Sequence, residues 1–411
     1  MTSDIPASIQ ALDAGDPLAG FRSRFALPPG IIYLDGNSLG ALPAGTASRL
    51  DAVIRQEWGD GLIRSWNSHD WIGAARRVGD KIAGLIGAKP GEVVVADSTS
   101  VNIFKLLMAA LGARPGRSVI LSEAGNFPTD LYVAQGVVSS MPGLSLKAVA
   151  PEGLLAAIDE NVAVLLLTHV HYKTGTRHDM AAITRRAHEK GALVIWDLCH
   201  SAGAVAVDLA AVDADMAVGC GYKYLNGGPG APAFLYVAER LQGELTSPVT
   251  GWLGHAAPFE FSGDYRPAPG IARFLSGTPP ILGLAALEAG VDLQLQADPA
   301  AVEAKGLALA NLFIAEVEAR CGGAPALASP RDPARRGLHV SFAHPEGYAI
   351  VQALIARGMV GDFRAPDIAR FGFSPLYLSF AQVWDAAAAM ADVVATRAFD
   401  APQFKTRAAV T

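Results

Sequence analysis

Gly219-Cys220-Gly221-Tyr222-Lys223-Tyr224-Leu225-Asn226-Gly227-Gly228-Pro229-Gly230 is the stretch of this chain that decides the fold. It places Lys223 in a glycine-rich turn, directly after an apolar run at residues 216–218 that is typical of a buried strand. Asp197 ends another apolar run upstream, at residues 194–196. A lysine that can form a Schiff base and a carboxylate that can keep a pyridine nitrogen protonated are what pyridoxal phosphate (PLP) chemistry requires. The two residues therefore predict a PLP site at the ends of two strands.

Short apolar runs alternate with helical patterns through the middle of the chain. The predicted strands are residues 92–96, 118–121, 162–167 and 192–196, and the predicted helices are residues 103–111 and 180–190, with Gly191 ending the second helix. Continuous apolar strands separated by helices indicate an α/β fold with a mostly parallel sheet covered on both faces. In such sheets ligands bind beyond the carboxyl ends of the strands. Ser98, Thr99, Thr168, Asp197 and Lys223 all lie at or just past predicted strand ends, so one site could collect them.

The pattern changes near residue 300. A long helix at 301–320, an alternating strand at 337–342, a helix at 347–357 and a short strand at 376–380 predict a smaller α+β domain. A chain of 411 residues is also too long for one ordinary core. We expect an N-terminal segment packing near the active site (1–45), a large PLP-binding domain (46–295) and a small C-terminal domain (296–411). The stretch 263–280, rich in proline and glycine, indicates a loop arranged around a site.

Composition excludes several classes of protein. Hydrophobic residues make up 51% of the chain and charged residues only 18%, which argues against extensive disorder. The net charge is −6 and no basic run exceeds two residues, so nothing supports nucleic-acid binding. The three cysteines are widely spaced, which predicts reduced thiols and no metal site. The N-terminus lacks the features of a signal peptide, and the apolar runs are far shorter than a membrane span. We expect a cytoplasmic enzyme with no membrane partner.

Several blocks of sequence, in order, resemble the kynureninase family. They are residues 33–40 (Tyr-Leu-Asp-Gly-Asn-Ser-Leu-Gly), 98–102, 126–130, 197–203, 221–224, 251–255, 277–280, and Arg370 followed by 375–377. The match runs from about residue 30 to 380. It is specific because related PLP families share the aspartate and the lysine but not these flanking motifs. The resemblance implies the aminotransferase-like PLP fold (fold type I) and a homodimer with active sites at the subunit interface. It also implies hydrolysis of L-kynurenine to anthranilate and L-alanine, in tryptophan catabolism through the kynurenine pathway and in NAD biosynthesis.

The cofactor's phosphate needs N–H groups and hydroxyls at a helix start. Thr99 and Ser100 stand where a strand gives way to a helix, which suits a bound anion, although serine and threonine are also ordinary N-caps. The resemblance implies further cofactor contacts: phosphate donors at Tyr222 and Trp252, a stacking ring at Phe127, and contacts from Asp130, Thr168, His200 and Thr278. A core aromatic at Phe127, an interior histidine at His200 and a plain strand-end threonine at Thr168 are the ordinary alternatives.

The substrate needs a clamp for its α-carboxylate and a slot for its aryl ring. Arg370 matches the family position for a bidentate clamp, and Arg364 is the local competitor. Trp66, Gly277 and Thr278 are the candidates for the aryl slot, with Asn37 and Ser38 nearby, although Trp66 could equally be a core residue. Gly-Thr at 277–278 departs from the Ser-Asn of animal-type members, which favours kynurenine over 3-hydroxykynurenine. The family also implies that Trp252 and the 277–278 loop reach the site from the partner chain.

The expected chemistry assigns one role to each catalytic residue. Lys223 carries the cofactor and removes the α-proton, Asp197 holds the ring nitrogen protonated, and Tyr222 exchanges a proton during cleavage. The alternatives are another fold type I enzyme, either a cysteine desulfurase or an aminotransferase, or a PLP-fold binding protein without catalysis. A desulfurase needs a mobile nucleophilic cysteine near the site. Cys199, Cys220 and Cys321 are poor candidates because they lie in motifs at the ends of predicted strands or a predicted helix.

Overall fold

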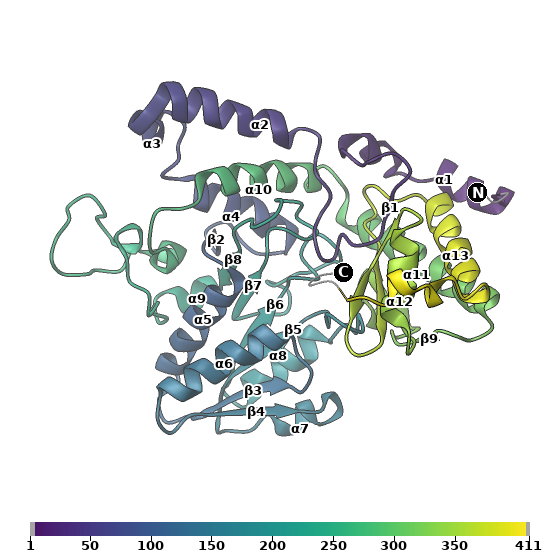
Figure 1. Ribbon diagram of the computed structural model, residues 1–411. Coiled ribbons are helices and arrows are strands. Elements are labelled where there is room, and N and C mark those ends of the chain that lie inside the picture. The colour runs from purple at the N-terminus through teal and green to yellow at the C-terminus, as the bar shows by residue number, and fades with distance from the viewer. Residues whose placement is uncertain (1–4, 408–411) are drawn as a thin grey trace.

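The computed structural model describes residues 5–407 and is built around a seven-stranded sheet with the order β2-β8-β7-β6-β5-β3-β4 (Figure 1). All its strands run parallel except β8, which is antiparallel to both of its neighbours. The strands are β2 (Val93–Val95), β3 (Val119–Glu123), β4 (Ser145–Val149), β5 (Val162–Thr168), β6 (Leu193–Asp197), β7 (Met216–Gly219) and β8 (Phe234–Val237). Every residue of β5 and β6 is buried, as the continuous apolar runs predicted. The expected α/β fold with a mostly parallel sheet is confirmed.

Helices cover both faces of this sheet because the connections run in two directions. From β2 to β4 the chain moves towards one edge of the sheet, and from β4 to β7 it returns. Right-handed crossovers then place α5 and α6 on one face and α7 and α8 on the other. The helices of this part are α4 (Ala74–Leu85), α5 (Thr99–Ala113), α6 (Pro128–Ser140), α7 (Leu154–Ala157), α8 (Met180–Glu189), α9 (Glu239–Gln242) and α10 (Ile281–Gln294). Gly191, just past α8, has φ +72°, as expected for a glycine that ends a helix.

A second, smaller unit follows and is built on a four-stranded antiparallel sheet with the order β12-β13-β10-β9. Its elements are α11 (Pro299–Cys321), β9 (Ala326–Leu327), β10 (His339–Ala343), α12 (Gly347–Ile355), β11 (Met359–Val360), β12 (Asp362–Arg364), β13 (Ile368–Gly372) and α13 (Phe380–Ala395). The N-terminal segment packs against this unit, since β1 (Ile32–Tyr33) pairs with β11, and α1 (Ala7–Ala14) lies against α13. Figure 1 shows the smaller unit at the right of the large sheet.

Two large hydrophobic cores accompany these units, besides a small cluster that includes Val170, Tyr224 and Leu338. One contains buried residues between Ala74 and Val291, and the other joins N-terminal residues from Ile9 to Ala41 with residues from Leu293 to Phe399. On this basis we propose the three-part division into residues 1–45, 46–295 and 296–411.

The strand predicted at residues 376–380 is wrong. The chain turns at residues 375–377, and α13 begins at Phe380. The Ser379 hydroxyl accepts a hydrogen bond from the Gln382 N–H (3.2 Å), while the Gln382 side chain accepts from the Ser379 N–H (3.1 Å). This capping box is a helix-start signal that the apolar run before it obscured. Leu376, Tyr377 and Leu378 are buried, but as a packed turn rather than as a strand.

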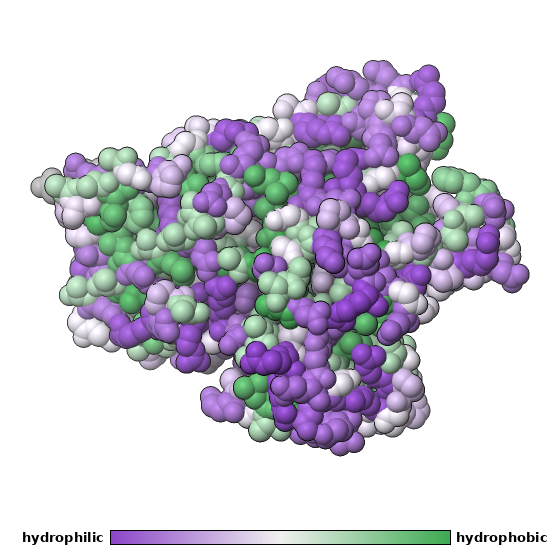
Figure 2. All heavy atoms as spheres, turned by 180° about the vertical axis from the view of Figure 1, so that it is seen from behind, coloured by the Kyte–Doolittle hydropathy of each residue, from purple (hydrophilic) through white to green (hydrophobic). Residues whose placement is uncertain are grey.

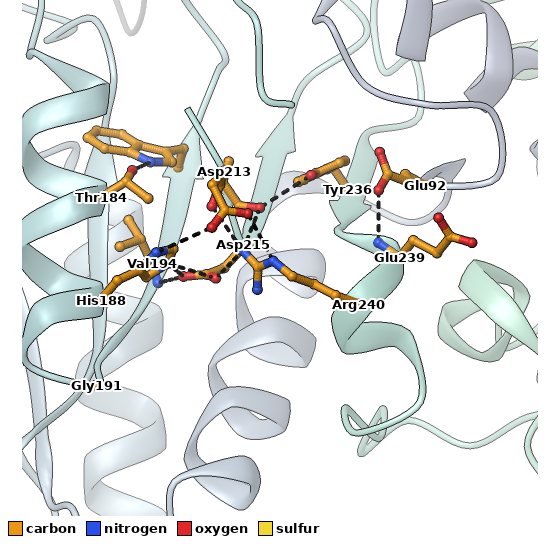
Figure 3. A network of polar contacts seen from close by, with 12 residues as sticks. Glu92, Thr184, His188, Gly191, Val194, Asp213, Asp215, Tyr236, Glu239 and Arg240 are labelled. Atoms are coloured by element: carbon orange, nitrogen blue, oxygen red, sulfur yellow. Dashed lines mark hydrogen bonds and ion pairs between the residues drawn. The ribbon is translucent and has the colours of Figure 1, made fainter. Parts of the chain in front are cut away.

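A buried polar network holds the amino-terminal ends of β6 and β7 (Figure 3). The Asp215 carboxylate accepts hydrogen bonds from the Val194 N–H (2.8 Å), His188 Nε2 (3.0 Å) and Arg240 Nη2 (2.8 Å). The side chain of Asp215 is 1% exposed. Every described contact of this carboxylate is at the end of the sheet opposite to the strand carboxyl ends, where it joins β6, β7, α8 and α9.

We expect this network to make stability depend on pH. The hydrogen bond to Asp215 raises the pKa of His188, against the opposing effect of its partial burial. A raised folded pKa contributes stability that is complete below the unfolded value of about 6.5 and is lost as pH rises through the folded value. The unfolding free energy of wild type should therefore exceed that of His188→Gln by more at about pH 6 than at about pH 9. Denaturant melts of both proteins across this range check it, and a difference that does not vary with pH would contradict it.

Candidate active site

A cavity of about 450 Å³ lies at the carboxyl ends of β5, β6 and β7. Among the predicted cofactor and catalytic residues, those that line it are Thr99, Ser100, Phe127, Asp130, Thr168, Asp197, His200, Tyr222 and Lys223. The register explains part of this set, because Thr168 pairs with Asp197 and Asp197 pairs with Val218 across the parallel strands. Residues from distant parts of the chain thus meet at one edge of the sheet, as the strand ends predicted.

Lys223 enters the cavity from a tight turn after β7. Its Nζ lies 3.1 Å from His200 Nε2, 5.9 Å from the centre of the Phe127 ring and 5.8 Å from that of Tyr222. The Gly227 N–H donates to the Gly221 carbonyl (2.9 Å), which closes the turn. A Cβ at Gly221 would lie 2.4 Å from the Pro232 carbonyl oxygen, so the close approach of the two segments requires glycine.

Two carboxyl groups, Asp130 and Asp197, are buried side by side in the cavity. Burial raises the pKa of Asp130 well above its usual value, and the neighbouring Asp197 charge raises it further. Burial also raises the pKa of Asp197, but hydrogen bonds from Cys199 and Asp130 and the charge of Lys223 oppose the rise. The Cys199 N–H donates to Asp197 at 2.7 Å. We infer that the pair shares one proton, held on Asp130, and that Asp197 carries the negative charge.

The amino terminus of α5 faces the cavity through Thr99 and Ser100. The Ser98 hydroxyl caps this helix by accepting from the Val101 N–H (3.4 Å). Asp97, just before it, has φ +48° and pairs with Lys105, whose ammonium is fully buried and also donates to the Phe274 carbonyl (2.7 Å). This buried pair fixes the turn that aims the free N–H groups of the first helical turn at the cavity, an arrangement suited to a phosphate.

The residues present fit PLP. A helix start can receive the phosphate, a lysine stands opposite, and a charged carboxylate lies at the floor. His200 is buried and its Nδ1 has no protein partner, so it retains a hydrogen bond for a ligand. Phe127 is 38% exposed, with its ring set edge-on to Tyr172 at 5.2 Å between ring centres, and is available for stacking on a flat ring.

The predicted carboxylate-binding residues cluster beside the cavity. Arg370 donates to the Ser38 hydroxyl (2.8 Å), to Asp362 and to the carbonyl of Tyr172, which itself lines the cavity. With its amide oxygen turned towards the guanidinium, Asn37 also accepts from Arg370 (3.0 and 3.2 Å). Arg364 shares the same Asp362 carboxylate (2.6 Å), but its side chain is 37% exposed, against 1% for Arg370.

The residues predicted for the aryl slot lie outside this cavity in the single chain. Trp66 packs edge-on against Trp252, with 6.4 Å between ring centres, while Gly277 and Thr278 are exposed. Neither the tryptophans nor the 277–278 loop lines the cavity. Their assignment to an aryl slot stays a prediction.

Several residues that the sequence did not single out also contribute. Tyr172, Asp97 and Thr129 line the cavity, and Asp362 pairs with the predicted clamp. Tyr172 follows β5, so its position after a strand end is a signal that could have identified it. Nothing in the local pattern around Asp362 distinguishes it from an ordinary strand residue.

No cluster of three or more His, Cys, Asp or Glu side chains within residues 5–407 could hold a metal ion. No helix in the same range combines the length and apolar character needed to cross a bilayer.

Known proteins similar to this chain fall into two groups. The family model described as the kynureninase C-terminal domain matches residues 302–390. Kynureninase from Pseudomonas fluorescens is 53% identical over 408 residues, which is 98% of each chain, and kynureninase from Burkholderia pseudomallei (strain 1106a) is 52% identical over the same shares.

The second group consists of solved structures with lower identity. The apo cysteine desulfurase of Thermococcus onnurineus superposes with a TM-score of 0.76 at 20% identity, covering 96% of this chain and 100% of that one. A C-DES mutant with glycine covalently linked to its PLP cofactor gives a TM-score of 0.74 at 19% identity, covering 90% and 99%. At this identity the likeness establishes the fold alone, and the fold is that of fold type I.

Proposed function

This chain belongs to the kynureninase family, and from that premise we propose that it is a PLP-dependent hydrolase that cleaves the Cβ–Cγ bond of L-kynurenine. One water is consumed, and the products are anthranilate and L-alanine. The observation that carries the proposal is the meeting of Lys223, Asp197 and the start of α5 in one cavity. Membership of the family supplies the substrate, which this cavity alone does not specify.

Each residue of the cavity has a definite task in this reaction. Bound PLP supplies an electron sink for the bond-breaking steps at the substrate's α-carbon. Lys223 binds the cofactor covalently and moves the α-proton, and the charged Asp197 keeps a proton on the ring nitrogen. Thr99, Ser100 and the first N–H groups of α5 hold the phosphate. Phe127 covers the ring, and His200 and Thr168 orient its polar edge.

We assign the proton transfer during cleavage to Tyr222 because its side chain lines the cavity beside Lys223. Burial, and then the neighbouring thiols and Asp197, raise the pKa of its phenol, so it is protonated at neutral pH but is a weaker acid than a free tyrosine. It lies one residue from Lys223, and the two side chains line the same cavity. Arg370, with Asn37 and Ser38, binds the substrate's α-carboxylate.

The alternative reactions have weaker support. A cysteine desulfurase needs a nucleophilic cysteine that can approach the substrate, but Cys199 and Cys220 are buried in the floor of the cavity and Cys321 lies at the end of α11. An aminotransferase would return a keto acid. One assay separates these reactions: protein, PLP and L-kynurenine are mixed, and anthranilate fluorescence and L-alanine are measured. Equal amounts of both products are expected, and a keto acid or no anthranilate would contradict the proposal.

The residues at 277–278 lead us to propose a preference for kynurenine. Gly277 and Thr278 replace the larger polar pair of animal-type members, which removes groups that could bind a ring hydroxyl. We expect a higher kcat/KM for L-kynurenine than for 3-hydroxykynurenine in parallel assays. The opposite order would remove these positions from the aryl slot.

We further propose a homodimer that completes the site. An arm formed by α2 (Thr46–Ala52), a π-helix (Val53–Gly61) and α3 (Ser65–Ser68) projects at the top of Figure 1, and the loop at residues 255–269 projects at its left. Their exposed side chains include Trp58 (58%), Ile63 (77%), Phe259 (64%) and Phe261 (78%). In Figure 2 the arm at the upper right is mostly hydrophilic, with a few hydrophobic groups between it and the loop. A second copy of the chain would bury these side chains. In such a dimer, Trp66, Trp252 and Thr278 of each chain would reach the cavity of the other chain.

Charged substitutions on this surface should separate the subunits. We expect Ile63→Glu combined with Phe261→Glu to give a monomer with little anthranilate formation, because charges at the centre of an apolar interface oppose association. Sedimentation velocity and activity check this together. Leu155→Glu is the matched control, since Leu155 is also exposed (48%) but lies on α7, and it should remain dimeric and active. A fully active monomer would contradict the shared site.

The cytoplasm is the location we propose. All three cysteines are free thiols, as expected for a reducing compartment.

A further inference from the structure

Arg370 is paired with Asp362, a residue to which the proposed reaction assigns no role. Asp362 lies directly opposite Arg370 in the register of β12 and β13. Arg370 Nε donates to Asp362 Oδ1 at 2.8 Å, and Nη2 donates to Asp362 Oδ2 at 2.5 Å. The Asp362 side chain is 4% exposed and that of Arg370 is 1% exposed, so this is a buried, side-on pair and not a surface contact.

The two edges of the Arg370 guanidinium have different partners. The Nε–Nη2 edge is occupied by Asp362. The Nη1–Nη2 edge donates to the Tyr172 carbonyl and to the Ser38 hydroxyl, and Tyr172 lines the cavity. A carboxylate arriving from the cavity therefore meets the second edge, where every competing acceptor is neutral: the Tyr172 carbonyl, the Ser38 hydroxyl and, at Nη2, the Asn37 amide oxygen. A bidentate guanidinium–carboxylate pair is stronger than any of these contacts.

We propose that Asp362 is the positioning residue of the substrate-binding site, which fixes Arg370 by one edge so that the other edge receives the α-carboxylate of an amino-acid substrate. The inference rests on the proposed function, because it assigns the carboxylate to Arg370. Asp362 also accepts from Ser38 (2.8 Å) and Arg364 (2.6 Å), so it arranges the neighbouring donors as well.

The charges around Asp362 fit a substrate that carries one carboxylate. Arg364 and Arg370 are cationic, and both guanidiniums, with a hydrogen bond from Ser38, outweigh burial and lower the pKa of Asp362 so that it is ionised. Burial, with the Asp362 charge, raises the pKa of the adjacent Asp35 to about 7, so Asp35 is partly neutral at physiological pH. Its Oδ1 has no protein partner. The cluster therefore retains positive charge that one incoming carboxylate can balance.

The test compares two ligands that differ only in the α-carboxylate: L-kynurenine, and its decarboxylated amine. Dissociation constants on PLP-loaded wild type and Asp362→Asn are taken from the initial absorbance change of the bound cofactor after rapid mixing, before kynurenine is turned over. Because misplacing a binding group by about 1 Å can cost about 10²-fold, we expect the variant to bind kynurenine about 10²-fold more weakly. Binding of the amine should change less than about twofold, which is within the error expected for an uncoupled site.

Controls separate positioning from general damage. Asp215→Asn also removes a carboxylate from a buried ion-pair network, at the far end of the sheet, and should lower stability without changing the ratio of the two dissociation constants. If Asp362→Asn does not fold, Asp362→Glu decides, because it keeps the buried charge but lengthens the side chain that fixes Arg370, and it should weaken kynurenine binding alone. Equal weakening of both ligands, or no weakening, overturns the proposal. Wild type that binds kynurenine more tightly than the amine but forms no anthranilate would refute the proposed reaction and not the role of Asp362.

Discussion

Replacing Lys223 by alanine is expected to abolish the formation of anthranilate. The same amine both binds the cofactor and moves the substrate's α-proton, and proton transfer alone is typically worth about 10²–10⁴-fold in rate. We therefore expect a loss of more than about 10⁴-fold, together with loss of the absorbance of the lysine-bound cofactor. Steady-state assays and spectra of the purified variant measure both effects.

Lys147→Ala is the control for this substitution, because Lys147 is an exposed lysine on β4, away from the cavity. It should keep normal turnover and a normal spectrum. A Lys223→Ala protein with near-normal turnover would exclude Lys223 as the catalytic amine, whatever its spectrum.

Asp197→Asn should also be strongly damaging, while Asp130→Asn should be mild. In the proposed site Asp197 supplies the negative charge that would keep the ring nitrogen protonated, and an amide cannot do so. Removing one such electrostatic partner in a buried site typically costs about 10²–10³-fold in kcat. Asp130 is held in its protonated form by burial and by Asp197, so an amide that keeps a hydrogen-bond donor replaces it closely. The kcat of each variant, at saturating PLP, measures the difference.

The contrast between the two variants tests which carboxyl group carries the charge. Equal losses would mean that the proton is shared evenly between the two groups. A larger loss in Asp130→Asn would assign the charge to Asp130 and contradict the geometry in which Cys199 donates to Asp197.

The large sheet and the cofactor cavity could be predicted from the sequence because their signals are local. Residues 162–167 form a fully buried strand, as their apolar run indicated, and Asp197 and Lys223 lie at the ends of neighbouring strands. Ser98 and Thr99 begin a helix whose start faces the same cavity. In a parallel sheet, strand ends alone are enough to predict which side chains meet.

Other parts of the site depend on contacts between distant residues, which no local pattern reveals. The role proposed for Asp362 follows only from the strand register that places it beside Arg370. The contribution of Tyr172 likewise follows from its carbonyl, which accepts a hydrogen bond from Arg370. The strand predicted at 376–380 was wrong because an apolar run fits a buried turn as well as a strand. The positions of Trp66, Trp252 and Thr278 at an active site stay a prediction, since they require a second chain.

The fold by itself does not select the reaction. The cysteine desulfurase of Thermococcus onnurineus has the same fold at 20% identity, whereas the kynureninases are more than half identical to this chain over nearly its whole length. The difference in chemistry therefore lies in the side chains of the site and not in the fold. In the site proposed for this chain, those side chains include Tyr222 and the Arg370–Asp362 pair.

The most direct test of the account identifies the lysine that binds the cofactor. The protein is loaded with PLP, treated with borohydride to make the linkage permanent, digested and analysed by mass spectrometry. We expect the phosphopyridoxyl mass on the peptide that contains Lys223, and its absence from that peptide in Lys223→Ala. A label on any other lysine, or no label at all, would contradict it.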